Sequence, residues 1–315
     1  MSEVFTRVGE QNLRITNLDK VLFPEVGWTK AEVINYYLQV APIAIPHLSD
    51  RAVTRIRFPN GVAADQPSFY EKNLPSGCPD WVARQPVRTS DGIVSYLLVG
   101  DPETLVYLAN LAALELHVPQ WTVSSATPDA DGVVTLPGHD PQPADPLADR
   151  IVVDCDPGEG ITMVDNAKAA MIIGAELAGD GLIPVPKTSG NKGLQVSAAI
   201  APTGCEAARA YVKGLATRLA ERHPDLFVVT MDKKVRAGHI FLDYNQNMAA
   251  RNTVAPYSLR AREAPRVATP VTWDEVAAVD APDALRFSPE EVLARIEEHG
   301  DLAEDLLIDD PPALP

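Results

Sequence analysis

The chain has 315 residues, 46% of them hydrophobic, and its three cysteines, Cys78, Cys155 and Cys205, lie far apart. This composition argues against global disorder and a disulfide scaffold, and it suits a reducing cytoplasm. There is no signal-peptide-like start and no apolar run of ~18 residues, so we expect no membrane contact.

Net charge is −16, which by itself argues against binding to the phosphates of a nucleic acid. The charge is unevenly distributed, however. Residues 271–315 contain 13 acidic and 2 basic residues, whereas residues 187–266 contain 13 basic and 6 acidic residues. A locally basic groove can therefore exist inside this acidic protein, and the total charge does not decide the partner.

Apolar periodicity predicts an irregular alternation of strands and helices. The expected helices are 30–48, interrupted at its prolines, then 102–116, 167–181, 205–223 and 290–307. The expected strands are 52–58, 93–99, 151–156 and 239–246, with two more strands joined by a turn in 182–200. Residues 126–149, rich in proline and aspartate, predict a loop. This order indicates an α/β or α+β core with a mixed sheet.

Two aspartates alternate with a cysteine at the end of the strand 151–156. Because side chains alternate across a strand, Asp154 and Asp156 should face one side and Cys155 the other. Close carboxylates repel each other and favour a divalent cation such as Mg²⁺ or Mn²⁺. Asp243 ends another apolar strand and is a candidate third ligand of a two-metal nucleotidyl-transfer site. A strand-end turn and a glycosyltransferase remain alternatives for this pattern.

The segment PKTSGNKG at 186–193 has the composition of an anion-binding turn. Its glycines allow backbone N–H groups to converge on an anion, and Lys187, Lys192 and Ser189 add charge and a hydroxyl donor. The spacing of a P-loop is absent. An ordinary polar hairpin turn is the alternative.

Six ordered blocks together resemble one enzyme family. They are TNLDKVLFPEVGWTKAEVINYY, RFPNG…SFYEKN…PDWV, LANLAALELHVPQW, DCDPGEG, KTSGNKGLQV and DYNQNMAARNTVAPYSLRAR. In this order they resemble the polymerase domain of bacterial ligase D, in the archaeo-eukaryotic primase superfamily, over residues 13–275. The resemblance implies an α+β fold, in which a primase-like core with an RRM-like palm joins an N-terminal α/β module around mixed and antiparallel sheets.

The resemblance also implies a domain organisation. We expect a single catalytic domain over 1–300, with a DNA-binding module at about 1–120, a palm at about 121–275, and an acidic helix and tail at 276–315. A KxDG ligase motif is absent from the sequence, so we expect a stand-alone form that lacks the ligase module.

By resemblance, Asp154, Asp156 and Asp243 are the catalytic residues and hold two divalent metals, Mn²⁺ or Mg²⁺. The residues that match the family's nucleotide contacts are His117, Ser189, Lys192, Gln246 and Arg260. Without the resemblance, His117 would be a core histidine on an apolar helix and Arg260 a solvated arginine.

Three positions depart from the family pattern without removing a metal ligand. Cys155 stands where leucine is usual, Gln195 where histidine is frequent, and His239 where lysine is frequent.

A pocket for the 5′-phosphate of a downstream DNA strand is implied at Asn17, Lys20 and Lys30, whose amide and ammonium donors suit a phosphate. From residue type alone, Asn17 would be a helix cap and the lysines surface charges.

Further DNA contacts are implied by resemblance at Phe69, Tyr70, Lys72, Arg57 and Arg236. The aromatic pair would stack on template bases, Arg57 would line the DNA groove with its neighbour Arg55, and Arg236 would reach toward the active site or the primer end. Core aromatics, a surface strand face and a basic turn are the alternatives.

These features lead to a hypothesis of a primase-polymerase that fills short gaps or extends ends, favouring ribonucleotides. The expected partners are gapped or broken DNA with a 5′-phosphate, rNTP or dNTP, a Ku-like protein and a separate DNA ligase. The expected location is the bacterial cytoplasm, at the nucleoid. The alternative is a DNA end-binding or synapsis module with weak or no catalysis, which would not need three aspartates.

Overall fold

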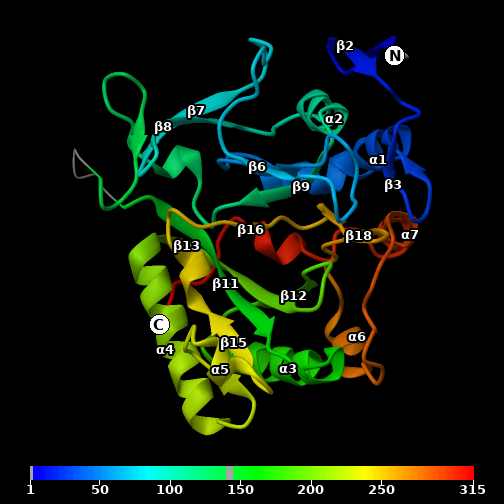
Figure 1. Ribbon diagram of the computed structural model, residues 1–315. Helices are drawn as coiled ribbons and strands as arrows, with labels where there is room; N and C mark the ends of the chain where they lie inside the picture. The colour runs from blue at the N-terminus through cyan, green and yellow to red at the C-terminus, as the bar shows by residue number, and fades with distance from the viewer. Residues whose placement is uncertain (1–2, 140–144) are drawn as a thin grey trace.

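The computed structural model describes residues 3–139 and 145–315, and it shows two main sheets, one above the other in Figure 1. The first sheet has the strand order β16 (Thr253–Val254), β9 (Ala113–Val118), β5 (Thr54–Arg57) and β6 (Phe69–Glu71). The second has the order β12 (Pro184–Thr188), β13 (Leu194–Gly204), β11 (Leu147–Pro157), β15 (Ile240–Asp243) and β14 (Phe227–Val228). Pairing is antiparallel except between β14 and β15, so the second sheet is mixed.

Smaller strand groups surround these sheets. They are β1 (Glu3–Val8) with β2 (Gln11–Thr16), β3 (Val21–Phe23) with β4 (Trp28–Thr29), β10 (Val134–Thr135) with β7 (Arg84–Thr89) and β8 (Gly92–Leu97), and β17 (Leu259–Ala261) with β18 (Pro265–Val267). The α-helices are α1 (Lys30–Leu48), α2 (Pro102–Asn110), α3 (Met163–Gly179), α4 (Cys205–Arg222), α5 (Lys233–Arg236), α6 (Trp273–Ala277) and α7 (Pro289–His299). Among the described residues, no helix combines the length and the apolar character needed to cross a membrane.

Helix α1 continues through Pro42 and Pro46, so the interruption expected at these prolines is wrong. A proline lacks the N–H that donates to the carbonyl four residues earlier. Both prolines are exposed and lie four residues apart, on one solvent-facing ridge where water can bond to the freed carbonyls. The opposite face buries Tyr36, Tyr37 and Val40, and this burial outweighs the two lost bonds.

The segment expected as one helix over 102–116 is instead a helix followed by a strand. Helix α2 ends at Asn110, Ala112 has a φ of 57°, and β9 then forms an inner strand of the first sheet. A fully buried strand is continuously apolar, so its sequence resembles a buried helix. His117 therefore lies on a strand rather than on a helix.

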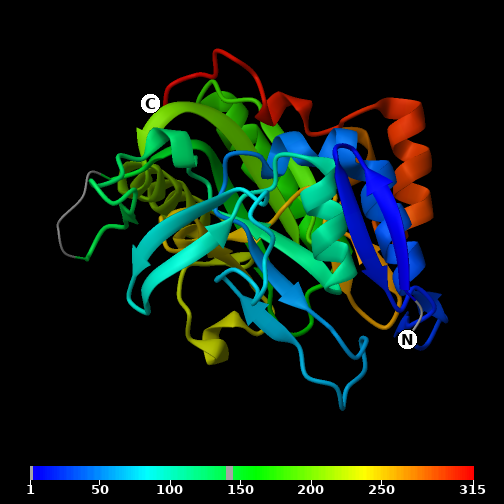
Figure 2. The ribbon, with the colours of Figure 1, turned by 90° about the horizontal axis from the view of Figure 1, so that it is seen from above.

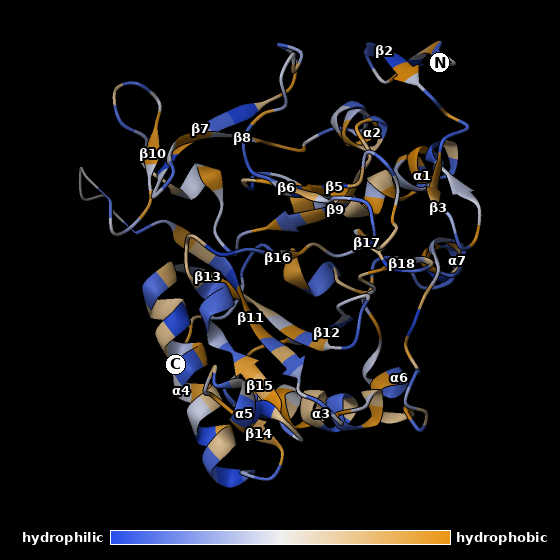
Figure 3. Ribbon diagram, in the orientation of Figure 1, coloured by the Kyte–Doolittle hydropathy of each residue, from blue (hydrophilic) through white to orange (hydrophobic). Residues whose placement is uncertain are grey.

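One face of the second sheet is covered by α3 and α4. Alternate residues of β11 and β13, including Cys155 and Val196, share an apolar cluster with these two helices. Figure 3 shows mixed hydropathy along α4, as expected for a helix with one buried face. Asp154, Asp156 and Gln195 alternate with the apolar residues, so they leave the sheet on its other face.

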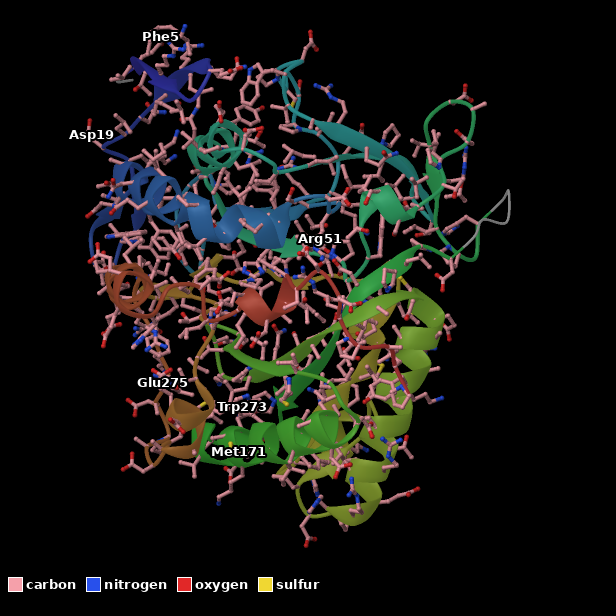
Figure 4. All side chains as sticks on the ribbon, turned by 180° about the vertical axis from the view of Figure 1, so that it is seen from behind. Phe5, Asp19, Arg51, Met171, Trp273 and Glu275 are labelled. Atoms are coloured by element: carbon pink, nitrogen blue, oxygen red, sulfur yellow. The ribbon has the colours of Figure 1, made fainter. Side chains whose placement is uncertain are left out.

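Ion pairs and hydrogen bonds join the two halves of the molecule. Arg51 is 1% exposed, and its Nη2 donates to Asp149 Oδ1 at 2.7 Å while its Nη1 donates to the carbonyls of Pro119 and Trp121. Figure 4 shows Arg51 in the interior, in contrast to Phe5 on the outlying β1–β2 hairpin. Seen from above in Figure 2, that hairpin lies against the α1 and α2 side of the molecule.

The segment after α7 is bonded into the fold through Asp301. Its Oδ2 lies 2.8 Å from Nε2 of His47, which is fully buried in α1. Its Oδ1 accepts from the Tyr257 hydroxyl at 2.6 Å and from the backbone N–H of Ala303 at 2.9 Å. One carboxylate thus connects the C-terminal segment to α1 and to the chain before β17.

Candidate active site

Three aspartates lie together at the end of the second sheet. Asp154 of β11 is directly opposite Asp243 of β15 in the antiparallel register, and Asp156 opposes Phe241. Since opposed residues share a face, as do residues two apart, all three carboxylates leave the same side. Cys155 is buried in the apolar cluster on the other side, as the alternation predicted.

The negative charges of this cluster oppose one another. Burial, together with the charges of Asp156 and Asp243, raises the pKa of Asp154 to about 7, although a hydrogen bond from Gln195 opposes the rise. Burial and Asp243 also raise the pKa of Asp156, and Arg236 lowers it. The fold therefore keeps together carboxylates that would be more stable apart.

The donor set fits a divalent cation by its chemistry, because Mg²⁺ and Mn²⁺ prefer carboxylate oxygens and would offset this charge. Within residues 3–139 and 145–315, however, no three His, Cys, Asp or Glu side chains are gathered into a shell that could hold a metal ion. Amides hold the carboxylates instead: Gln195 Nε2 donates to Asp154 at 3.1 Å and Gln246 Nε2 to Asp243 at 2.9 Å. The two-metal site therefore stays a prediction.

The cluster opens into a pocket of about 320 Å³ whose walls come from both main sheets and from the turn between β12 and β13. The lining includes Asp154, Asp156, His117, Ser189, Lys192, Gln195, Gln246, Asn252 and Arg260. All five residues matched to nucleotide contacts thus meet the carboxylates here.

The β12–β13 turn is held close to strand β11. A Cβ at Gly193 would lie 2.5 Å from the carbonyl oxygen of Cys155, so only glycine permits this approach. Ser189 Oγ accepts hydrogen bonds from the N–H groups of Asn191 and Gly193 at 3.3 and 3.2 Å. Lys192 is exposed and lines the pocket. This places Lys192 near the aspartates, whereas the N–H groups of Asn191 and Gly193 bond within the turn, so anion binding by this turn stays a prediction.

Lys187 lies on β12 and not in the turn after it, contrary to the prediction that it adds charge to that turn. It is 5% exposed, and its Nζ donates to Gln195 Oε1 at 2.7 Å. Burial lowers its pKa to about 7, against the attraction of Asp154. Lys187 bonds to Gln195, and Gln195 bonds to Asp154. Lys187 therefore positions a residue of the pocket lining and does not line this pocket itself.

Glu115 is an acidic residue of this site that the sequence analysis missed. Its Oε2 lies 3.2 Å from His117 Nε2 and 3.3 Å from Arg260 Nε, and its Oε1 accepts from the N–H of Ala261. These partners lower the pKa of Glu115 although burial opposes them, and burial lowers the pKa of His117. Only the strand register reveals the pair, because Glu115 and His117 share a face in a strand but not in the expected helix.

Asn17, Lys20 and Lys30 lie together, beside the start of α1. The Lys20 N–H donates to the carbonyl of Asn17 at 3.0 Å, and the Lys30 N–H donates to that of Lys20 at 2.8 Å. Lys30 is buried, its Nζ donates to the Thr16 carbonyl at 2.6 Å, and burial with the nearby Lys20 lowers its pKa to about 8. The cap of α1 is Thr29, so Asn17 is not a helix cap.

Phe69 and Tyr70 are exposed rather than buried in the core. They are 45% and 54% exposed on the edge strand β6, and the Tyr70 hydroxyl bonds to Asn252, a residue of the pocket lining. Lys72, which follows this strand, is half-buried. Both rings are exposed, and the hydroxyl contact places Tyr70 beside the pocket.

The arginines of β5 form ion pairs within the sheet. Arg55 is buried, and its Nη2 donates to Glu71 at 2.6 Å, so it does not line an open groove. Arg57 Nη1 also donates to Glu71, at 2.9 Å, and its Nε donates to the carbonyl of Leu111.

Arg236 is directed toward the carboxylate cluster. It ends the short helix α5, its Nη2 lies 3.6 Å from Asp156 Oδ2, and its guanidinium stacks on the Phe241 ring at 4.7 Å.

Comparisons with known proteins give a consistent result. The family described as LigD, primase-polymerase domain, matches residues 29–303. The chain is 42% identical over 302 residues to the multifunctional non-homologous end joining protein LigD of Mycolicibacterium smegmatis, covering 96% of this chain and 37% of that protein. It is 32% identical over 290 residues to the bifunctional non-homologous end joining protein LigD of Bacillus subtilis, covering 91% and 43%. The chain thus spans about two fifths of the length of these curated relatives.

Among solved structures, the chain is similar to the polymerase domain from Mycobacterium tuberculosis ligase D in complex with DNA. The TM-score is 0.85 at 40% identity, and the match covers 96% of this chain and 100% of that one.

Proposed function

The chain belongs to the LigD primase-polymerase domain family, and on that premise we propose that it is a template-dependent nucleotidyltransferase that fills short DNA gaps or extends DNA ends in repair. The primase-like α+β fold expected from the sequence is confirmed by the likeness to the solved polymerase domain. The finer parts of this proposal are a preference for ribonucleotides and recognition of a downstream 5′-phosphate.

The observation that carries the proposal is the meeting of two opposite charges in one pocket. Asp154 and Asp156 supply carboxylates to the pocket lining, with Asp243 opposite Asp154 in the strand register, and Lys192 and Arg260 supply cations to the same lining. A nucleoside triphosphate bound with a divalent cation needs both kinds of side chain. Its phosphates are anionic and need cationic partners, and the divalent cation needs oxygen ligands. A site for DNA end-binding alone would use cations for the DNA phosphates but would not need the three aspartates.

In the proposed reaction, the residues of this chain position the reactants. Ser189, Lys192 and Arg260 hold the triphosphate, beside His117, whose ring Glu115 orients. Gln246 contacts the nucleotide, and Tyr70 with Phe69 stacks on the template. Asp154, Asp156 and Asp243 would hold the divalent cations, which lower the pKa of the 3′-hydroxyl and neutralise charge on the phosphates when bound. Positioning of the reactants and stabilisation of charge in the transition state supply most of the rate enhancement in such phosphoryl transfers.

The test is extension of a primer across a short gap with Mn²⁺ or Mg²⁺, comparing ribonucleotides with deoxynucleotides. The ribonucleotide preference follows from the family resemblance and is measured in the same assay. Template-dependent extension supports the proposal. Binding of gapped DNA without extension under any condition would favour the end-binding module instead. We also propose that a Ku-like protein and a DNA ligase act on the same ends.

Lys20→Ala tests recognition of the 5′-phosphate. Lys20 is exposed beside Lys30 and bonds only weakly to Asn60, at 3.4 Å, so its loss should not affect folding. We expect the stimulation of extension by a downstream 5′-phosphate to fall about fivefold, with unchanged extension when that phosphate is absent. Lys168→Ala, an exposed lysine on α3, is the matched control. Equal loss on both substrates would contradict the assignment.

A further inference from the structure

A second cavity adjoins the nucleotide pocket. It has a volume of about 710 Å³, and Asn191 and Lys192 of the β12–β13 turn line both cavities. The rest of its lining comes from the bend after β17, from β18, from the residues just before α7 and from the segment 62–64. We call it the arginine groove, because Arg262, Arg266 and Arg286 line it with Lys192, against two acidic residues, Glu25 and Glu263.

In the part of the chain that the structure describes, the three arginines of this groove form no ion pair. Among the described residues, no carboxylate oxygen lies within 4.0 Å, the limit for an ion pair, of a nitrogen of Arg262, Arg266 or Arg286. This is so although the protein carries a net charge of −16. Nε of Arg262 is also buried without a hydrogen-bond partner. In a protein with excess acid, so many unpaired arginines around one cavity indicate an anionic ligand.

The β17–β18 ribbon connects the two cavities. Arg260, in the nucleotide pocket, is directly opposite Arg266, in the arginine groove, so two like charges leave the same face of the ribbon. The turn packs tightly against this ribbon, because a Cβ at Gly190 would lie 2.5 Å from Arg260 Cγ and 2.9 Å from the Val267 carbonyl oxygen. A line of cations therefore runs from the nucleotide pocket into the groove.

The lining favours a small polyphosphate over a nucleic-acid strand. Strand-binding grooves combine cations with exposed aromatic platforms for the bases. Of the residues that the structure describes, Phe287 is the one aromatic residue lining this groove, and it is partly buried in the core and covered by Arg295 at 4.6 Å. The exposed pair Phe69 and Tyr70 does not line it. The groove thus offers cationic side chains for phosphates but no exposed aromatic ring on which a base could stack.

We propose that the arginine groove binds the pyrophosphate that leaves the nucleotide pocket, an inference that rests on the proposed nucleotidyl transfer. In that reaction the primer 3′-oxygen bonds to the α-phosphorus, and the bond from this phosphorus to the oxygen that bridges to the β-phosphate breaks. The electron pair of the broken bond stays on pyrophosphate, and the hydroxyl proton passes to water. Lys192 borders both cavities and can contact the pyrophosphate during transfer and during release.

The test is calorimetric titration of inorganic pyrophosphate into the full chain without DNA, with the nucleotide pocket saturated by a nucleoside triphosphate. The variant carries Arg266→Ala and Arg286→Ala, which change residues outside the nucleotide pocket. Arg222→Ala, an exposed arginine on α4 paired with Glu176, is the matched control. We expect the double variant to bind pyrophosphate roughly tenfold more weakly and the triphosphate within about twofold of the unchanged chain, and the control to change neither.

Three results would overturn the proposal: unchanged pyrophosphate affinity, an equal loss of triphosphate affinity, or loss of oligonucleotide binding with pyrophosphate binding intact. The primer-extension assay is read separately. If primers are extended but pyrophosphate binding does not depend on the arginines, the proposed function stands and the assignment of the groove fails. If pyrophosphate binding depends on the arginines but no primer is extended, the proposed function fails. The role of the groove in pyrophosphate release then fails with it.

Discussion

Asp154→Asn is expected to abolish primer extension, by about 10³-fold or more, while making the fold more stable. The amide keeps the size of the side chain and can still accept the hydrogen bond from Gln195. It cannot supply the charge that would hold a cation against the triphosphate, so stabilisation of the transition state is lost. Primer extension on gapped DNA measures the first effect, and thermal unfolding in the presence of a chelator measures the second.

The gain in stability follows from the direction of the pKa shift. The pKa of Asp154 rises from 3.8 to about 7 on folding, so protons bind the folded state more tightly. The free energy of unfolding therefore falls as pH increases from about 4 to about 7, and the full penalty applies above that range. Asparagine removes the penalty, which we expect to be on the order of 1–3 kcal/mol at pH 8.

Opposite changes in activity and stability distinguish a functional carboxylate from a structural one. Asp225→Asn, an exposed aspartate beyond the end of α4, is the control and should change neither quantity. If Asp154→Asn destabilised the fold, the carboxylate would be a structural hydrogen-bond acceptor. If extension survived, the second sheet would not carry the catalytic centre.

Asp301→Ala is expected to cost about 3 kcal/mol of stability, although the residue lies outside both cavities. The change removes the acceptor for the Tyr257 hydroxyl, for the N–H of Ala303 and for the fully buried His47. A buried donor left without a partner carries its full desolvation cost, and two side chains are affected here. Denaturant unfolding followed by tryptophan fluorescence measures the loss.

The control for this second prediction is Asp305→Ala, an exposed aspartate in the same segment. It should stay within about 0.5 kcal/mol of the unchanged chain. A loss of the same size in both variants would mean that the segment responds to any change of charge, and that the bonds of Asp301 are not responsible.

Local sequence patterns were enough to predict much of the candidate site. The alternation of Asp154, Cys155 and Asp156 depends only on the two-residue period of a strand, and the structure has the expected arrangement. The turn with Ser189 and Lys192 depends on glycines that permit a close approach of the backbone. Asp243 was a candidate third ligand because it ends an apolar strand, but its position opposite Asp154 depends on strand pairing, which periodicity could not supply.

The sequence by itself determined the family, most of the helices, the strands that bear the aspartates and the composition of the turn between β12 and β13. The tertiary structure alone decided that 113–118 is a strand, that α1 continues through Pro42 and Pro46, and that Lys187 is buried behind Gln195. The physical reason is the same in each case. Burial against distant segments contributes more free energy than local propensity, and which side chains become neighbours depends on the packing of residues far apart in the chain.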